Sequence, residues 1–174
     1  MKKFRNLLLG ALLSLSLISV SQAQSFSEGD FVINAGIGLG TTFATYGAGG
    51  FGLPIGGGVE YGITDLETGS IGIGADIGYV GSDFVSVLTF GARGSYYLTE
   101  VFNIDNEKLD IYAGLGLYYR DYNIKGLGSA WDWGSGVYPA FHAGARYFFA
   151  DNIGAYAELG NNWGWLNIGV TFKL

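Results

Sequence analysis

The feature that most constrains the fold of this chain is the way its charges fall along stretches in which apolar and polar residues alternate. Successive side chains of an extended strand point to opposite faces, so alternation with a period of two predicts strands with one apolar and one polar face. Within the predicted strands, as far as Arg120 in the fifth, no charge falls on the apolar face. The charges of the polar face are Asp30, Glu60, Asp76, Arg93, Asp110, Arg120, Arg146, Glu158 and Lys173.

The same alternation predicts eight strands and no helix after residue 23. The 31 Gly, 12 Tyr and 12 Phe favour strands, because glycine and aromatic residues are poor in helix interiors. No segment shows a sustained apolar period of 3.6. The predicted strands lie at about residues 30–40, 52–63, 70–80, 84–98, 109–122, 138–149, 152–160 and 165–174.

The placement of the charges indicates which face of the strands is turned outward. In a water-soluble barrel the apolar face would turn inward, and few charges among many glycines would be left to solvate the outer wall. In a membrane barrel the apolar face meets lipid, where an Arg or Lys at the midplane would cost about 2–4 kcal/mol. Only a closed barrel satisfies every backbone group there. We therefore predict an all-β, eight-stranded antiparallel up-and-down transmembrane β-barrel.

Residues 1–23 have the pattern of a secretory signal peptide that is removed. Three basic residues among the first five precede a 14-residue apolar run at 7–20 and the small-x-small end Ser21-Gln22-Ala23. This run is shorter than the roughly 20 residues of a transmembrane helix. We expect cleavage before Gln24, with residues 24–174 forming one barrel domain. The six basic and fifteen acidic residues that remain argue against a nucleic-acid partner.

The lengths of the connections predict the orientation of the barrel. With both termini in the periplasm, the external segments are 41–51, 81–83, 123–137 and 161–164, and the periplasmic turns are 64–69, 99–108 and 150–151. Long external loops and short periplasmic turns are the rule for such barrels, and 99–108 is the exception here. The external loops carry Trp131, Trp133 and Trp163, which we interpret as interfacial anchors or as an exposed aromatic surface that grips a partner.

The C-terminal strand carries a resemblance to a known family. The spacing of Asn167, Gly169, Phe172 and Leu174 resembles the C-terminal signal that the assembly machinery of bacterial outer-membrane barrels reads. With the motifs Ala143-Gly-Ala-Arg-Tyr-Phe-Phe149, Asp151-Asn-Ile-Gly154 and Glu158-Leu-Gly160, the chain resembles the small eight-stranded outer-membrane barrels of the OmpA/OmpX type. The resemblance implies the cell outer membrane as the location, with membrane lipid and the barrel assembly machinery as partners. We expect a monomer.

The charges of the lumenal face are the strongest candidates for a function. Three arginines are expected to pair with four acids across a narrow interior: Arg93, Arg120 and Arg146 with Glu60, Asp76, Asp110 and Glu158. An eight-stranded barrel leaves room for little besides side chains, so these residues are interpreted as an ionic plug. The predicted function is then structural or surface interaction through the external loops. Two alternatives stay open: a narrow passive channel for small solutes or ions, and a soluble periplasmic barrel that binds an apolar ligand.

The sequence gives little support to catalysis or to a metal or cofactor site. His142 is the only histidine, and a single His without a neighbouring Ser–acid pair at a strand end predicts a structural role. The chain has no cysteine and no second His, so no metal site is expected. The glycine runs at 36–40 and 56–58 lack the following helix and the lysine of phosphate-binding loops. We expect no cofactor and no enzymatic activity.

Overall fold

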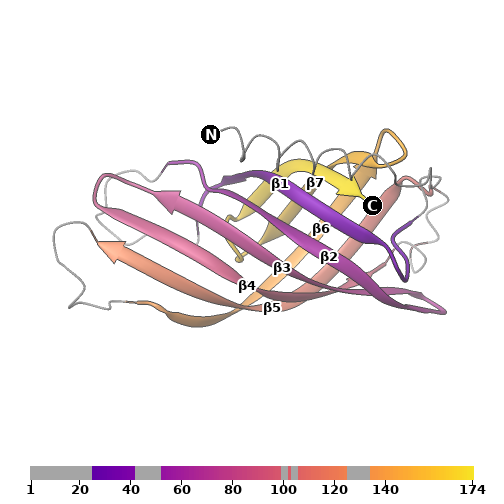
Figure 1. Ribbon diagram of the computed structural model, residues 1–174, viewed down its shortest axis with the longest axis horizontal. Coiled ribbons are helices and arrows are strands. Elements are labelled where there is room, and N and C mark those ends of the chain that lie inside the picture. Colours follow the sequence, from indigo (N-terminus) through magenta and orange to yellow (C-terminus); the bar gives the residue numbers. More distant parts are fainter. Residues whose placement is uncertain (1–24, 42–51, 99–101, 103–105, 125–133) are drawn as a thin grey trace, which may run out of the picture.

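The computed structural model describes residues 25–41, 52–98, 102, 106–124 and 134–174. Each of the eight strands is hydrogen-bonded antiparallel to the next in sequence, and β8 returns to pair with β1, which closes a barrel (Figure 1). The strands are β1 (Phe31–Leu39), β2 (Ile55–Leu66), β3 (Gly69–Gly81), β4 (Val85–Tyr97), β5 (Leu109–Ile124), β6 (Gly136–Phe148), β7 (Ile153–Gly160) and β8 (Leu166–Lys173). The predicted eight-stranded up-and-down barrel is confirmed.

The strand ends agree with the prediction to within a few residues. The largest difference is in β2, which runs to Leu66, so that only residues 67 and 68 connect it to β3. The pairing of these two strands shifts between Gly62 and Thr64, which is the signature of a β-bulge. The bulge interrupts the alternation of apolar and polar residues before the strand ends, so the sequence pattern predicts an end that is too early.

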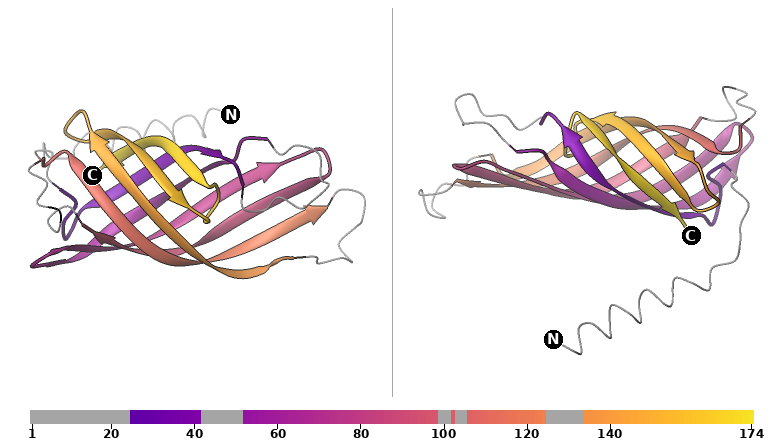
Figure 2. Two further views of the ribbon diagram at one scale, coloured as in Figure 1. Left: turned by 180° about the vertical axis from the view of Figure 1, so that it is seen from behind. Right: turned by 90° about the horizontal axis from the view of Figure 1, so that it is seen from above.

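The seam between β1 and β8 joins the first and the last strand of the barrel. It runs in register from Val32 opposite Lys173 to Leu39 opposite Leu166. Beyond the ladder, the amide of Leu174 donates to the carbonyl of Phe31 at 2.8 Å. Figure 2 shows β8 in yellow lying beside β1 in indigo. We call the end where β1 begins and β8 ends the inner end of the barrel, and the opposite end the outer end.

The two faces of every strand meet different surroundings. Apolar side chains point outward, and some are very exposed, such as Leu115 at 71% and Val137 at 66%. Charged side chains in the middle of the strands point inward and are almost fully covered, as Arg146 at 0% and Glu60 at 1% show. Asp65 and Asp121, near the ends of β2 and β5, are exposed. A soluble barrel that binds an apolar ligand would need the reverse arrangement, so this alternative is wrong.

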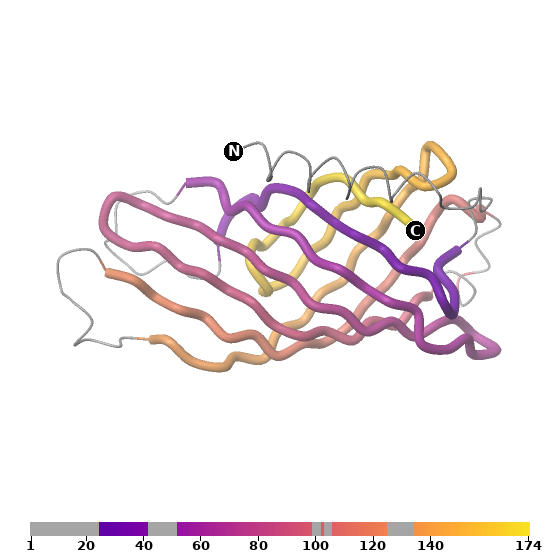
Figure 3. Tube along the Cα trace, in the orientation of Figure 1, coloured from indigo at the N-terminus to yellow at the C-terminus, as the bar shows by residue number. Residues whose placement is uncertain are grey.

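The strands are of unequal length, which makes the outer rim uneven. Strands β3 to β6 have 13 to 16 residues, whereas β7 and β8 have 8 each. In Figures 1 and 3 the β3–β4 hairpin and the end of β5 reach farther left than the yellow turn between β7 and β8. Within the described part of the chain, no helix has the length and hydropathy needed to cross a membrane.

Aromatic residues at the inner end divide between the two faces. Tyr147 and Phe149 point outward and are exposed, as expected for a girdle at the membrane surface. Tyr97 and Phe148, their neighbours in sequence or in space, are buried in the barrel. These aromatic residues therefore do not form one girdle, because alternation sends adjacent residues to opposite faces.

Candidate functional site

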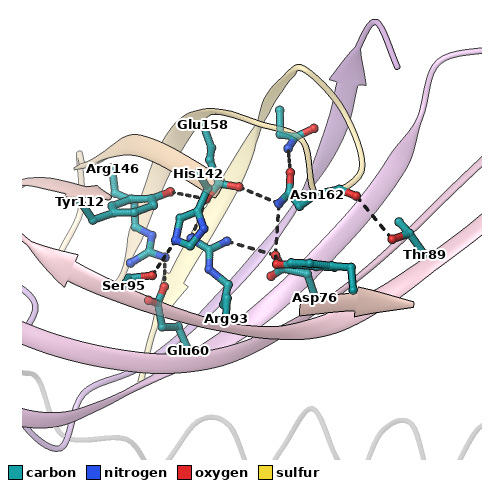
Figure 4. A network of polar contacts seen from close by, with 12 residues as sticks. Glu60, Asp76, Thr89, Arg93, Ser95, Tyr112, His142, Arg146, Glu158 and Asn162 are labelled. Carbon is teal, nitrogen blue, oxygen red and sulfur yellow. Dashed lines mark hydrogen bonds and ion pairs between the residues drawn. The ribbon is translucent and has the colours of Figure 1, made fainter. Parts of the chain in front are cut away.

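A cluster of charges crosses the middle of the lumen, with Arg93 of β4 at its centre. The two terminal nitrogens of its guanidinium contact two carboxylates: Nη1 lies 3.1 Å from Asp76 Oδ2, and Nη2 lies 2.7 Å from Glu158 Oε2. Asp76 comes from β3 and Glu158 from β7, so one arginine ties three strands together (Figure 4). Tyr118 of β5 donates its hydroxyl to Asp76 at 2.6 Å and brings in a fourth strand.

A second ion pair lies nearer the inner end. Arg146 of β6 contacts Glu60 of β2, with 2.6 Å between Nη2 and Oε2, and also donates to the hydroxyl of Tyr97. The ring of Tyr112 lies 4.5 Å from the Arg146 guanidinium, in cation–π contact. The hydroxyl of Tyr112 in turn donates to Glu158 at 3.1 Å. The two charge clusters therefore form one continuous network.

His142 and Ser95 lie inside this network and contact each other. Ser95 Oγ and His142 Nε2 are 2.9 Å apart, and both side chains are buried (Figure 4). Gly114 makes room for the imidazole, because a Cβ there would lie 2.6 Å from ring atoms of His142. The pair fills the wall of the lumen between the two arginines.

The turn between β7 and β8 bends into the outer end of the barrel. Asn162 in this turn donates its amide to Asp76 at 3.2 Å and to Glu158 at 2.9 Å, and accepts a bond from Asn167 at 3.0 Å. One amide thus caps both carboxylates that flank Arg93. Asn162 was not predicted from the sequence, because it lies in a turn, where no alternation indicates which way a side chain points.

Trp163, the next residue, is also inside the barrel and only 3% exposed. Gly56 and Gly78 make room for its indole, since a Cβ at Gly56 would lie 2.8 Å from the ring and a Cβ at Gly78 would collide with Trp163. The prediction of Trp163 as an exposed loop aromatic is therefore wrong. The exposed aromatic of this turn is Trp165, at 51%. Trp131 and Trp133, and the predicted signal peptide, lie outside the described residues.

Two of the predicted lumenal charges have partners other than those expected. Arg120 lies near the outer end, where it donates to the carbonyl of Asn161 at 2.6 Å and its guanidinium lies 4.8 Å from the ring of Tyr138. Asp110 lies opposite Arg146 in the ladder, yet it accepts a bond from the amide of Phe26 at 2.9 Å. The network of ion pairs thus contains Glu60, Asp76, Arg93, Arg146 and Glu158 of the seven charges predicted.

The predicted assembly residues occupy the closing strand. Asn167 points inward to Asn162, and Phe172 points outward into the apolar surface. Gly169 pairs with Gly36 across the seam, and a Cβ there would lie 2.6 Å from the Gly36 Cα. These positions belong to the strand that closes the barrel.

The comparisons with known proteins agree with this geometry. No protein-family model matches the chain, and no curated protein matches it. The N-terminal β-barrel domain of Pseudomonas aeruginosa OprF is similar in structure, with 19% identity and a TM-score of 0.55, over 86% of this chain and 100% of that one. The outer membrane protein OprG of Pseudomonas aeruginosa is similar with 12% identity and a TM-score of 0.52, over 88% of this chain and 99% of that one.

At these identities the likeness concerns the fold. The likeness agrees with three features of this chain, which are an exposed apolar belt, a charged interior and a closed ring of eight antiparallel strands. The resemblance drawn from the C-terminal motifs is confirmed at this level. The chain has the fold of the small eight-stranded outer-membrane β-barrels, with an outer surface made for lipid.

Proposed function

We propose that this protein is a non-conducting barrel of the outer membrane, closed by its lumenal network, which works through its external end in a structural or surface-interaction role. The observation that carries the proposal is the unbroken chain of contacts from Asn162 through Arg93 to Arg146. It draws on strands from all around the barrel and leaves both arginines almost without exposure. A lumen filled in this way holds the external loops on a rigid frame.

The energetics of buried charges favour a plug over a gate. Removing one partner of a buried ion pair typically costs about 3–5 kcal/mol, because the remaining charge stays buried without compensation. Opening a path past Arg93 would break its bonds to both Asp76 and Glu158 and would also uncover the Asn162 cap. A small solute that passes through offers nothing of comparable strength in return. The network therefore supports a permanent closure.

The outward surface supports residence in the bilayer as a monomer. The apolar belt is continuous around the ring and matches lipid, and the ends of the belt carry exposed aromatic residues such as Tyr79, Tyr119 and Tyr147. We extend the proposal to removal of residues 1–23 as a signal peptide and to insertion by the barrel assembly machinery through β8. The burial of Ser95 and His142, away from both rims, supports a structural role for this pair and no enzymatic activity.

A narrow passive channel is the second candidate, and one observation favours it. Among the described residues, three buried polar atoms on the adjoining strands β1 and β8 have no protein partner: Asn34 Oδ1, Asn167 Oδ1 and Thr171 Oγ1. Buried polar atoms of this kind usually bind water. A file of water along the β1–β8 wall would be the route of such a channel.

Single-channel recording in a planar bilayer separates these two functions. Purified barrel is refolded, and its folded form is verified by its gel migration before and after heating. Currents are then recorded for the wild type, Arg93→Ala and Arg120→Ala. We expect no channel openings from the wild type and none from the matched control Arg120→Ala. Any openings are expected only in Arg93→Ala, which lacks the central arginine. Reproducible openings of the wild type that change with Arg93→Ala would overturn the plug and establish the channel.

A further inference from the structure

Residues 25–30, which precede β1, fold back into the inner end of the barrel, where Figure 3 shows the indigo start of the described chain. We call this segment the N-terminal cork. Its Phe26 is only 3% exposed. The Phe26 ring stacks on the ring of Tyr97, with 4.0 Å between centroids and 16° between planes, and the Arg146 guanidinium lies 6.0 Å from the centre of the Phe26 ring. The Phe26 ring thus closes the lumen on the inner side of the Arg146–Glu60 ion pair.

The backbone of the cork is bound by carboxylates in an unusual way. Three successive amides each donate to an aspartate: Phe26 to Asp110 at 2.9 Å, Ser27 to Asp30 at 2.8 Å and Glu28 to Asp65 at 2.8 Å. The carbonyl of Phe26 accepts a bond from Ser70 Oγ at 2.6 Å. Bonds to ionised groups are stronger than neutral ones. Asp30 belongs to the cork itself, whereas Asp110, Asp65 and Ser70 belong to the barrel and bind the backbone of Phe26 and Glu28 in place of a neighbouring strand.

The hydrogen bond from the amide of Phe26 is the contact that accounts for Asp110. Its side chain is fully buried, and a buried carboxylate is costly unless donors compensate it. The amide of Phe26 supplies that donor, and the neighbouring Arg146 directs its own bonds to Glu60 and Tyr97. The position of Asp110 is thus explained by the cork and not by the ion pairs of the lumen.

The far side of the cork is fixed by a glycine and a lysine. Gly62 accepts a bond from the amide of Gly29 and donates to the carbonyl of Asp30, both at 2.9 Å. A Cβ at Gly62 would collide with the carbonyl oxygen of Ser27, so only glycine lets the segment approach β2 this closely. Lys173 Nζ lies 2.6 Å from Asp30 Oδ2 and ties the cork to the closing strand.

We propose that the inner end of the barrel is a binding site for a short peptide with one aromatic side chain, and that the chain's own residues 25–30 occupy it as a displaceable cork. Tyr97, Tyr112 and Arg146 form the seat for the ring, and Asp110 and Ser70 bind the peptide unit. The cork is held mainly by side chains and lies outside the barrel ladder, and such segments open locally at lower free energy than the strands that carry them. This inference is independent of the plug in the proposed function.

Chemical labelling tests the cork, because the chain contains no cysteine. Val32 is fully buried on the lumenal face of β1, in one cluster with Phe26, Tyr97 and Tyr112, so a thiol introduced by Val32→Cys lies within the contacts that Phe26 makes. Barrels in detergent micelles are exposed to a small charged thiol reagent and the labelling rate is measured. We expect Phe26→Ala to raise the rate about tenfold, in line with the loss of a stacked ring. The matched control Phe149→Ala, an exposed outward residue near the same end, is expected to leave the rate unchanged.

A second arm tests the site itself. In a variant that lacks residues 25–28, labelling is expected to be fast, and a synthetic peptide of residues 25–30 at millimolar concentration is expected to slow it. The millimolar range is chosen because it matches the effective concentration of a short tethered segment. The same peptide with alanine in place of Phe26 is expected to give no protection. Protection by both peptides alike would overturn the aromatic seat.

The remaining outcomes also decide the proposal. If the deletion variant does not refold, Asp110→Asn, which keeps the shape of the side chain, is expected to raise the labelling rate several-fold. Unchanged labelling in both Phe26→Ala and Asp110→Asn would overturn the cork. Conductance is recorded on the same preparations, so the two ideas fail separately. A silent barrel with unchanged labelling loses only the cork, and a conducting wild type with Phe26-dependent labelling loses only the plug.

Discussion

Arg146 of β6 and Glu60 of β2 form an ion pair with 2.6 Å between Nη2 and Oε2, although their strands lie on opposite walls of the barrel. Three strands separate β2 from β6 in either direction around the ring. The pair therefore spans the lumen, and it does so with both side chains fully covered. This ion pair links two opposite walls of the barrel, and in the proposed function it helps to close the lumen.

The first prediction concerns the ion pair between Arg146 and Glu60. Arg146→Met leaves Glu60 buried without its counter-charge and is expected to lower the free energy of unfolding by about 3–5 kcal/mol. The double variant Arg146→Met with Glu60→Gln removes the stranded charge and is expected to recover a large part of that loss. Urea unfolding of the barrel in lipid vesicles, followed by tryptophan fluorescence, measures both. A double variant no more stable than Arg146→Met would show that the pair is not coupled.

The second prediction concerns the room that glycine gives to Trp163. Gly78→Ala places a methyl group against the Trp163 side chain and is expected to cost about 1–3 kcal/mol through overpacking. The matched control is Gly94→Ala, where the nearest atom to the added Cβ is 4.0 Å away and the effect is expected to stay within about 0.5 kcal/mol. In a Trp163→Ala background the penalty of Gly78→Ala should shrink. The same penalty with and without the indole would contradict the packing described.

The third prediction concerns the lipid-facing belt. Leu115→Arg, in the middle of the outward face of β5, is expected to cost about 2–4 kcal/mol in a bilayer. Leu53→Arg, on an exposed residue just before β2, is expected to cost about 0–1 kcal/mol, because an arginine near the interface reaches water. Refolding into vesicles and unfolding with urea gives both values. Equal costs at the two positions would count against a transmembrane belt.

The fourth prediction concerns the closing strand. Phe172→Ala is expected to reduce the amount of folded barrel in the outer membrane of cells, because we predict that this aromatic residue is part of the signal read during insertion. Ile168→Ala removes an apolar side chain from the same outward face of β8 and serves as the control. The two variants are expected to lose similar stability in vitro, about 1–3 kcal/mol at most. Equal folded amounts in cells would remove Phe172 from the assembly signal.

Much of the fold could be read from the sequence because a barrel strand records its surroundings at every second residue. The alternation that put Arg93 on one face and Ala92 on the other is the alternation found in β4. The same rule separates Tyr96 from Tyr97, whose side chain is buried in the barrel. Alternation gives the face of a side chain, and the face was enough to place the charges in the lumen.

The choice of partners could not be read in the same way. Glu60 and Asp110 are both acids on the lumenal face, and only the closed ring brings Glu60 to Arg146 and Phe26 to Asp110. Phe26 and Trp163 lie outside the strands, where no period indicates direction. The burial of both side chains was therefore missed, since each lies on a segment that bends back into the barrel.

The uneven rim has a consequence for the membrane around the barrel. A strand of eight residues, tilted about 40°, rises roughly 20 Å along the barrel axis, whereas thirteen residues rise roughly 33 Å. The β7–β8 wall is thus shorter than the apolar band of about 25 Å that such barrels present, and the β3–β6 wall is longer. A wall that is too long for the bilayer is accommodated by tilting, and a wall that is too short by local thinning of the bilayer. The barrel should stand inclined in a fixed direction, with the bilayer thinnest beside β7 and β8.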